Sequence, residues 1–591
     1  MSEVPDGRRR VIIEGVSPEI DGGRFPIKRV PGEKVVVEAD IYADGHDVLA
    51  AALLFRREGE EEWSEVPMKA LVNDRWRGKF TVEEVGTYEY TIEAWVNQFR
   101  TWRRNLEKKF AARMDVALEL LTGREFIQAV QKRAEGQDRR ELESVAESLS
   151  PENPLPDSAK VLTVLNERIV ELMDEYLERK HSVRYARKLR VQVDPLPARF
   201  SAWYEFFPRS CAPEPGRHGT FKDCEAMLAR VARMGFDTVY FPPIHPIGTT
   251  YRKGRNNSLI VEPGDPGSPW AIGSEEGGHK AVNPALGTLE DFQALVAKAR
   301  KLGLQIALDI AFQCSPDHPY VKEHPEWFRH RPDGSIQYAE NPPKKYQDIY
   351  PLDFESEDWR GLWIELKSIF EFWIEQGVRV FRVDNPHTKP FRFWTWCLGG
   401  LKREHPDLIF LSEAFTRPKV MYQLAKLGFT QSYNYFPWRN TKHEIQTYLE
   451  ELTQTEVQEF FRPNLWPNTP DILTQNLQYG GRPVFVSRLI LAATLGASYG
   501  IYGPPYEICE NTPREPGSEE YLNSEKYEVR HWDLAVPGGL GDLMAHLNQI
   551  RRENPALQSN ERLCFHDVDN EQILVYSKHT EDLENIILVM V

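Results

Sequence analysis

Three acidic residues follow three separate strand-like runs of the chain. Asp384 ends the run VRVFRVD, Glu413 lies near the end of LIFLSEA, and Asp471 belongs to the loop NTPD. In a parallel barrel the carboxyl ends of all strands meet at one face, so side chains far apart in sequence come together there. Paired carboxyl groups at such a face are the groups that break and form bonds at the anomeric carbon of a sugar. The three acids therefore predict glycosidic chemistry.

The residue types around these acids indicate a role for each. Arg382 stands two residues before Asp384 and points to the same face of its strand, where its charge keeps the carboxylate ionised. Asp384 is thus the expected nucleophile and Glu413 the expected acid and base, with a pKa raised when the site closes. Asp471 is expected to hold sugar hydroxyls and to stabilise positive charge in the transition state. A single acid at a strand end is commonly a helix cap or an ion-pair partner, but three in this order, with Arg382 and His387 beside the first, favour catalysis.

Alternating strand and helix patterns after Ser201 supply the elements that must position these residues. The predicted strands are SAWYEFF, FDTVYFPP, LQIALDIAF, VRVFRVD, LIFLSEA, FTQSYNYF, a segment before NTPD, and ASYGIYGP. Amphipathic runs such as FKDCEAMLARVARMG lie between them, several closed by a glycine. Eight such units predict an α/β fold of the (β/α)₈ TIM barrel type. A long loop after the third strand, residues 312–356, is expected to be functional.

The rest of the chain predicts three further parts. Residues 1–98 form short alternating strands typical of a β-sandwich, and 99–192 are expected to form a helical bundle inserted before the barrel at 193–540. Residues 541–591 read as the start of a β-rich C-terminal domain, and because the last residues lie within an apolar strand, we expect this domain to be truncated. One apolar stripe in the bundle packs either inside the bundle or in a dimer interface, and comprises Val161, Leu165, Ile169, Leu172 and Tyr176.

Charge and composition argue against several classes of function. A formal charge of −16 disfavours nucleic acid and anionic membranes as partners. The apolar stretch from Leu489 to Gly503 is short and broken by polar residues, so it predicts a buried helix leading into a strand rather than a membrane span. The six cysteines form no CxxC pair, which together with the absence of a secretory peptide predicts a reducing, cytoplasmic compartment.

No metal or cofactor is expected either. The histidines near the predicted site lack the spacing of a metal motif, and no Gly-rich nucleotide motif opens a helix. His387 is interpreted as a hydrogen-bond donor to a sugar hydroxyl or as a helix-start residue. The other histidines near the site are His279, His318, His324 and His330.

Longer motifs carry a resemblance to a known family. GVRVFRVDNPH, LIFLSEAF and ALDIAFQCSPDHP resemble the α-amylase superfamily, glycoside hydrolase family 13. The strings SAWYEFFPRS, FPPIHPIG, SPWAIG, NPPKKYQDIYPLDF and SEKY narrow the resemblance, over nearly the whole chain, to bacterial maltosyltransferases of that superfamily. These enzymes extend α-1,4-glucans with α-maltose 1-phosphate as donor. The resemblance therefore implies these two compounds as the partners and a homodimer built through the sandwich and the bundle.

Carried over residue by residue, the resemblance implies Asp384 as nucleophile, Glu413 as proton donor and Asp471 as transition-state stabiliser. It implies donor contacts at Lys253, Gln313, Asp348, Asn385, Lys526 and Tyr527. Two departures from amylases fit the maltosyltransferases: Gln313-Cys314 replaces Asn-His, and Pro470 replaces the His before the third acid. The first departure also argues against a calcium site of the amylase kind.

A leaving phosphate needs hydrogen-bond donors near the anomeric carbon. Asn385 follows the nucleophile and offers a neutral amide, and the long loop adds ammonium and hydroxyl groups. The predicted phosphate cluster is Asn341, Lys344, Tyr346 and Asn385. The alternative for the loop is a solvated pair formed by Lys344 and Lys345.

Three functions remain open from the sequence. The first is maltosyl transfer from α-maltose 1-phosphate to the non-reducing 4-hydroxyl of an α-1,4-glucan, with release of phosphate and retention of configuration. The second is an amylase-type hydrolase or transglycosylase that uses the same carboxylates without phosphate. The third is a non-catalytic glucan-binding protein, against which the intact set Asp384, Arg382, Glu413 and Asp471 argues.

Overall fold

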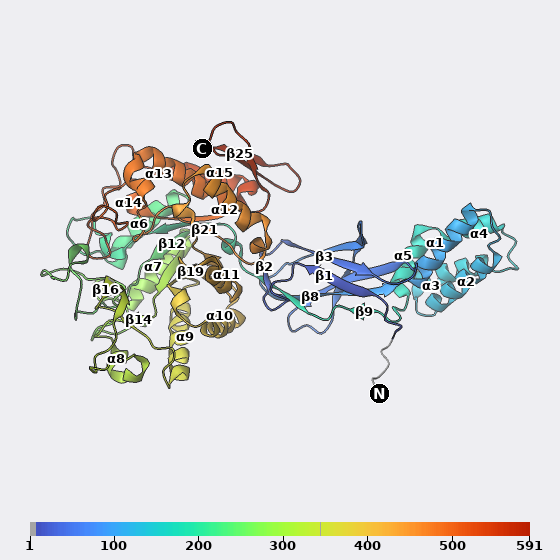
Figure 1. Cartoon of the computed structure of the whole chain (residues 1–591), viewed down its shortest axis with the longest axis horizontal. Helices are drawn as coiled ribbons and strands as arrows, with labels where there is room; N and C mark the ends of the chain where they lie inside the picture. The colour runs from blue at the N-terminus through green and yellow to red at the C-terminus, as the bar shows by residue number, and fades with distance from the viewer. Residues whose placement is uncertain (1–6, 343) are drawn as a thin grey trace. The chain divides into compact units, whose positions relative to one another are not determined.

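The computed structural model describes residues 7–342 and 344–591, and the chain divides into two compact units. The first unit comprises the residues up to 83 and 87–192, and the second comprises 84–86 and 193–591. Figure 1 labels their helices and strands.

Two antiparallel sheets form the strand-rich part of the first unit. One sheet has the order β1-β3-β7-β6 and the other β2-β10-β8-β4-β5, with β9 also paired to β8. The Phe80 ring of β7 stacks on Phe55 of β4 with centroids 4.5 Å apart, and it also contacts Tyr90 of β8. The two sheets therefore share a core as a sandwich. The strands are β1 (Ile12–Ser17), β2 (Ile27–Arg29), β3 (Lys34–Tyr42), β4 (Leu49–Arg57), β5 (Ser64–Pro67), β6 (Lys69–Ala70), β7 (Arg75–Thr81), β8 (Gly86–Val96), β9 (Val183–Arg184) and β10 (Leu189–Val193).

Five helices follow β8 and form a bundle at one end of these strands (Figure 1). They are α1 (Gln98–Ala111), α2 (Ala117–Gln131), α3 (Gly136–Ser148), α4 (Asp157–Val164) and α5 (Glu167–Tyr176). The predicted apolar stripe is divided between α4 and α5, because Asn166 caps a new helix with its side chain. Val161, Ile169 and Leu172 are buried in the bundle core, and the partly buried Leu165 and Tyr176 pack against it. The helical run ends at Tyr176, before the predicted bundle end at residue 192, because the chain returns to the sheet as β9 and β10.

Eight parallel strands in the second unit form the predicted barrel. Their order is β20-β19-β18-β13-β12-β11-β22-β21, and a parallel bridge between Ser432 and Pro463 joins the two ends. The strands are β11 (Ser201–Glu205), β12 (Thr238–Phe241), β13 (Gln305–Ile310), β18 (Val380–Asp384), β19 (Ile409–Glu413), β20 (Gln431–Ser432), β21 (Asn464–Leu465) and β22 (Ser498–Tyr502). The sixth and seventh strands have only two residues each, so the sixth is far shorter than the run FTQSYNYF suggested.

Helices alternate with these strands as the sequence predicted. Reciprocal side-chain caps begin α6, α7 and α12, and glycines with positive φ follow α6, α7 and α9 at Gly235, Gly303 and Gly377. The stretch from Leu489 to Gly503 forms the end of α13 and strand β22, as predicted. The helices are α6 (Phe221–Arg233), α7 (Leu289–Lys301), α9 (Trp359–Glu375), α10 (Phe391–Glu404), α11 (Pro418–Lys426), α12 (Lys442–Gln454), α13 (Gln475–Leu495), α14 (Gly503–Glu507) and α15 (Gly541–Glu553).

The period of two along each strand decides which side chains enter the barrel. Trp203, Ala307, Val380 and Leu411 belong to one buried cluster inside it. Because Glu205, Asp309, Arg382 and Glu413 stand two residues further along the same strands, they point inward one layer closer to the carboxyl ends. The lower layer is thus apolar and the upper layer charged.

The long loop after β13 contains small elements of its own. They are β14 (Gln313–Cys314), α8 (Pro319–Glu323), β15 (Ala339–Asn341), β16 (Lys344–Tyr346) and β17 (Tyr350–Pro351). Strands β15 and β16 form a hairpin, and β14 pairs with β17.

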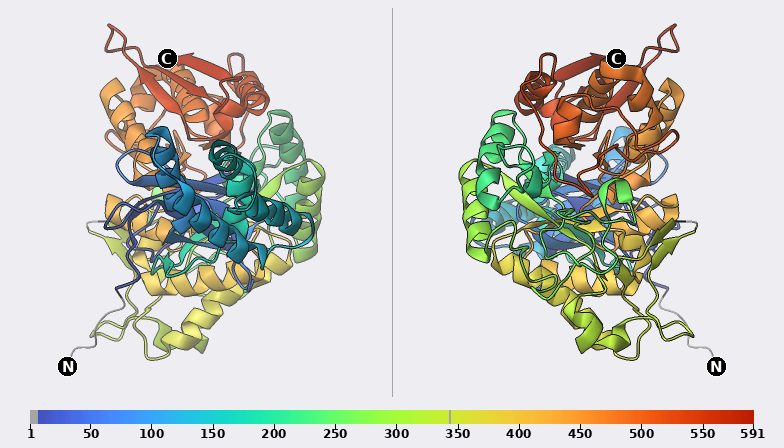
Figure 2. Two further views of the ribbon diagram at one scale, coloured as in Figure 1. Left: turned by 90° about the vertical axis from the view of Figure 1, so that its right-hand side faces the viewer. Right: turned by 90° about the vertical axis from the view of Figure 1, so that its left-hand side faces the viewer.

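A three-stranded antiparallel sheet ends the second unit. It consists of β23 (Leu563–His566), β24 (Val575–His579) and β25 (Ile586–Met590) and lies beside α13 and α15 (Figure 2). The Tyr576 hydroxyl of β24 is hydrogen-bonded to Thr494 of α13 at 2.6 Å. Across the described residues, no helix has the length and apolar character needed to cross a bilayer.

Candidate active site

A cavity of about 990 Å³ opens at the carboxyl ends of the barrel strands. The structure brings ten of the predicted site residues to its wall, although they span more than two hundred positions of the sequence. They are Gln313, Tyr346, Asp348, Asp384, Asn385, His387, Glu413, Asp471, Lys526 and Tyr527. This convergence follows from the parallel barrel, because every strand delivers its last residue to the same face.

Arg382 is the buried charge that organises the base of this cavity. One of its terminal nitrogens lies 2.9 Å from Asp384 Oδ1 and 3.0 Å from Asp309 Oδ2. The other lies 3.5 Å from Glu413 Oε1. Arg382 therefore holds the two acids expected to react in one electrostatic group and balances part of their charge.

Asp309 is a member of this group that the sequence reasoning missed. Its Oδ2 accepts hydrogen bonds from the Tyr240 hydroxyl at 2.7 Å and from the Trp270 indole at 3.0 Å. Burial raises the pKa of Asp309 to about 6, while Arg382 opposes the shift. The run LQIALDIAF contained the signal that could have identified it. Asp309 stands near the end of β13, and the pairing register places it opposite Arg382 of β18.

Glu413 has the environment of a group that exchanges protons. It ends β19 directly opposite Asp384 in the register of the two strands. Burial raises the pKa of Glu413 to about 7, and the negative charge of Asp384 adds to the shift, while Arg382 lowers it. Its Oε2 accepts a hydrogen bond of 3.1 Å from the backbone N–H of Asn385. A carboxyl group that titrates near neutrality fits both donation and removal of a proton.

Asn385 makes this contact because its backbone is left-handed, with φ of 41° and ψ of 52°. An Asn tolerates this conformation better than most residues. The turn directs its side-chain amide toward Asp384 Oδ2, at 3.4 Å, while its N–H faces Glu413. Asn385 thus contacts both carboxylates expected to react.

Asp471 and Lys526 form an ion pair at the cavity wall. The Lys526 ammonium also lies 5.2 Å from the centre of the Trp270 ring. The Asp471 side chain is 49% exposed, so it faces the open space of the cavity rather than the barrel interior. Lys526 therefore screens the third acid while leaving one side of its carboxylate accessible.

Asp348 is a buried acid at the cavity wall. Burial raises its pKa, and the positive charges of Lys253 and Lys526 oppose the shift. Its Oδ1 is buried and accepts no hydrogen bond from the described residues. Lys253 is buried and is absent from the described cavity lining. It acts on Asp348 through its positive charge, which favours the ionised carboxylate.

Gln313 and Cys314 have different environments although they are neighbours. Gln313 lines the cavity, and its side-chain amide donates to the Trp270 carbonyl at 3.2 Å. Cys314 is fully buried. The alternation along β14 sends one side chain to the site and the other to the interior.

His387 lies in a short 3-10 turn, Pro386–Thr388, and is half-buried at the cavity wall. Its Nδ1 atom is buried without a hydrogen-bond partner among the described residues. Tyr346 also lines the cavity. The side chains of Asn341 and Lys344, the other two members of the predicted phosphate cluster, lie outside the described part of the structure.

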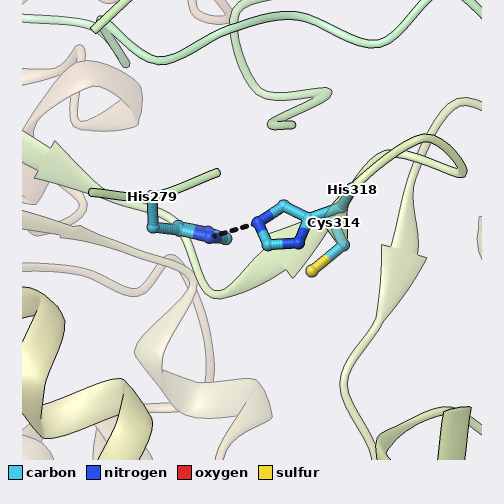
Figure 3. Close-up of side chains that lie close together, drawn as sticks. All are labelled: His279, Cys314 and His318. Atoms are coloured by element: carbon cyan, nitrogen blue, oxygen red, sulfur yellow. Dashed lines mark hydrogen bonds between the residues drawn. The ribbon is translucent and has the colours of Figure 1, made fainter. Parts of the chain in front are cut away.

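Three potential metal ligands lie together elsewhere in the second unit, among the residues that the structure describes. His279, Cys314 and His318 have ligand atoms within 4.8 Å of one another (Figure 3). The Tyr320 N–H donates to His318 Nδ1, and His318 Nε2 lies 3.0 Å from His279 Nδ1. His279 Nε2 in turn lies 2.9 Å from the Ala311 carbonyl.

One assignment of protons satisfies all three contacts. Both rings are neutral and carry the proton on Nε2, in keeping with burial that lowers the pKa of each. Every ring nitrogen is then used in a hydrogen bond, so a metal ion would have to displace these bonds. The group is best described as a hydrogen-bonded relay that fixes the loop after β13.

Comparisons with known proteins agree with this geometry. Residues 9–195 match the family model described as α-1,4-glucan:maltose-1-phosphate maltosyltransferase, domain N/S. A protein of that name from Chlorobaculum tepidum is 54% identical over 592 residues, which cover 99% of this chain and 88% of that protein. Another from Methylacidiphilum infernorum is 51% identical and covers 99% of this chain and 87% of its own length.

Solved structures support the fold. An α-amylase from Lactobacillus plantarum superposes with a TM-score of 0.52 at 22% identity, covering 65% of this chain and 87% of its own. An α-glucosyl transfer enzyme superposes with a TM-score of 0.50 at 15% identity, covering 66% of this chain and 90% of its own. The barrel is therefore of the amylase type. The near-complete matches at about half identity establish that the chain belongs to the α-1,4-glucan:maltose-1-phosphate maltosyltransferase family.

Proposed function

We propose that the protein transfers a maltosyl unit from α-maltose 1-phosphate to the non-reducing 4-hydroxyl of an α-1,4-glucan and releases phosphate. The observation that carries the proposal is the group formed by Arg382, Asp384 and Glu413. It places an acid paired with a buried guanidinium beside a second acid that titrates near neutrality. This asymmetry is what a double displacement at an anomeric carbon requires.

In the first step Asp384 attacks the anomeric carbon while the bond to the phosphate oxygen breaks. Glu413 gives its proton to the departing oxygen, and a β-maltosyl ester remains on Asp384. The contact of Asn385 with both carboxylates supports their alignment for this exchange.

In the second step Glu413, now ionised, removes the proton from the acceptor 4-hydroxyl, whose oxygen displaces Asp384. Two inversions retain the α configuration, and the glucan gains two glucose units. Asp471 holds sugar hydroxyls and stabilises positive charge at the ring. Its exposed carboxylate and its ion pair with Lys526 support this assignment.

The remaining assignments concern donor binding. Gln313, Asp348, Lys526 and Tyr527, which line the cavity, hold the maltosyl group, and Lys253 supports this donor contact through its charge on Asp348. The buried Asp348 oxygen that lacks a described partner supports a hydrogen bond to a sugar hydroxyl. The phosphate is assigned to the cluster Asn341, Lys344, Tyr346 and Asn385, and His387 donates to a hydroxyl. The position of the β15–β16 hairpin at the cavity, through Ala339 and Tyr346, supports a role in excluding water from the ester.

One experiment separates maltosyl transfer from hydrolysis or phosphate-independent transglycosylation. The protein is incubated with α-maltose 1-phosphate and glycogen, and both released phosphate and product chain lengths are measured. Transfer predicts one phosphate for every added pair of glucose units. Release of maltooligosaccharides without phosphate dependence would refute it.

A homodimer built through the first unit, in a reducing cytoplasmic compartment, completes the proposal. Leu118 and Leu162 are 71% and 68% exposed on the bundle, which supports a contact surface there. The six cysteines are all free in the described structure, which supports a reducing environment. Analytical ultracentrifugation of the wild type and of a Leu118→Glu, Leu162→Glu variant tests the dimer.

A further inference from the structure

Lys389 is a cation at the active-site cavity to which the sequence reasoning gave no role. It follows the 3-10 turn after β18 and lines the cavity together with Asp384 and Glu413. Its ammonium lies 2.9 Å from Thr388 Oγ1 and 3.4 Å from the Asn385 carbonyl. Both partners are neutral oxygens.

The charge of Lys389 is therefore uncompensated at short range. Within residues 7–342 and 344–591 it forms no ion pair with a carboxylate, whereas Lys526, the other lysine at this wall with a described side chain, is paired with Asp471. An ammonium group has three N–H donors, and the two described contacts leave one for a ligand. Burial lowers the pKa of Lys389, while Asp384, Glu413 and Asp309 oppose the shift. Burial therefore disfavours the charged ammonium, and an anion bound beside it offsets this desolvation penalty.

The left-handed turn at Asn385 gives this cation its position. The Asn385 N–H faces Glu413, and its carbonyl accepts from Thr388 Oγ1 at 2.8 Å and from Lys389. Lys389 and Glu413 thus contact the two ends of the same residue. The ammonium and Glu413 therefore belong to the same cavity wall and are joined through Asn385.

We propose that Lys389 binds the phosphate group of the donor and stabilises it as it departs, an inference that rests on the function proposed above. The electron pair of the breaking C1–O bond goes to the phosphate oxygen, which receives the Glu413 proton, while a carboxylate oxygen of Asp384 bonds to C1. The resulting hydrogen phosphate remains paired with Lys389. Lys389 would thereby distinguish a phosphorylated donor from a neutral glucan.

Comparing two donors tests this role. Wild type, Lys389→Met and Lys389→Arg are assayed with glycogen and either α-maltose 1-phosphate or α-maltosyl fluoride, whose leaving group carries no phosphate. The Lys389→Met variant is expected to lose about 10- to 100-fold in kcat/KM for the phosphate donor, the value of one charge-assisted hydrogen bond. With the fluoride donor it should lose about threefold at most, and Lys389→Arg should recover part of the loss because it restores the charge.

Two further measurements sharpen the result. The inhibition constant of inorganic phosphate should rise in Lys389→Met by a factor similar to the kcat/KM loss. Lys419, an exposed residue of α11, provides the matched control, and Lys419→Met should leave both donors unaffected. Equal losses with both donors, or no loss with either, would overturn the role of Lys389 while leaving the proposed function intact. A wild type that releases no phosphate would refute the function itself.

Discussion

Titration of Glu413 should dominate the pH dependence of the first half-reaction. Burial raises its pKa from 4.5 to about 7, a cost of about 3 kcal/mol for the charged form. The groups facing it are Arg382, Asp384, Asp471, Lys389 and the Asn385 N–H. Because phosphate release needs the protonated acid, activity must fall as the pH rises through this pKa.

The size of the fall follows from the same value. With a pKa of about 7, the protonated fraction of Glu413 drops about 50-fold between pH 7 and pH 9. The donor phosphate does not complicate this range, since its second ionisation, near pH 6, is almost complete at its lower end. The expected slope of kcat/KM therefore approaches one decade per pH unit.

The assay is initial-rate phosphate release at low donor concentration, because kcat/KM reports ionisations of the free enzyme. Glu413→Gln removes the titrating group while keeping its shape, so the remaining rate should be lower by about 10²- to 10⁴-fold and independent of pH above neutrality. The reasoning fails if the wild-type profile is flat from pH 7 to pH 9, or if Glu413→Gln retains the same alkaline limb.

Three further perturbations probe other parts of the structure. Asp384→Ala should abolish transfer without loss of the folded state, measured by phosphate release and circular dichroism; residual wild-type turnover would contradict its role as nucleophile. Lys526→Met removes the ion-pair partner of Asp471 and should lower kcat/KM by about 10-fold or more, because one charged hydrogen bond is lost; an unchanged value would show that Lys526 acts only at the surface. Lys578 is 1% exposed and burial lowers its pKa to about 7, so the unfolded chain binds more protons between that pH and the usual value of 10.5. The free energy of unfolding should therefore rise with pH across this window, and Lys578→Met should reduce the slope and raise stability near pH 7 by up to a few kcal/mol in urea titrations; an equal slope in both proteins would count against the shift.

Much of the barrel was predictable because its signals are local. The barrel strands β11, β12, β13, β18 and β19 are buried, mainly apolar runs, and the capping residues and glycines that bound the helices act within a few positions of themselves. The two-residue strands β20 and β21 were overestimated or uncertain because barrel closure, not strand propensity, defines them. Likewise, β9 and β10 join the sandwich through partners about a hundred or more residues away, which no local pattern reveals.

The candidate site likewise has features that local sequence determines and features that depend on distant contacts. Sequence by itself determined which acids end which strands, and hence that Asp384, Glu413 and Asp471 meet at one face of the barrel. Only the tertiary structure decided that Arg382 contacts two further acids besides Asp384, that Asp309 belongs to their group, and that Lys389 faces the cavity without a described carboxylate partner. The physical reason is that strand identity depends on neighbouring residues, whereas burial, charge pairing and pKa depend on groups brought together from distant positions by the closed sheet.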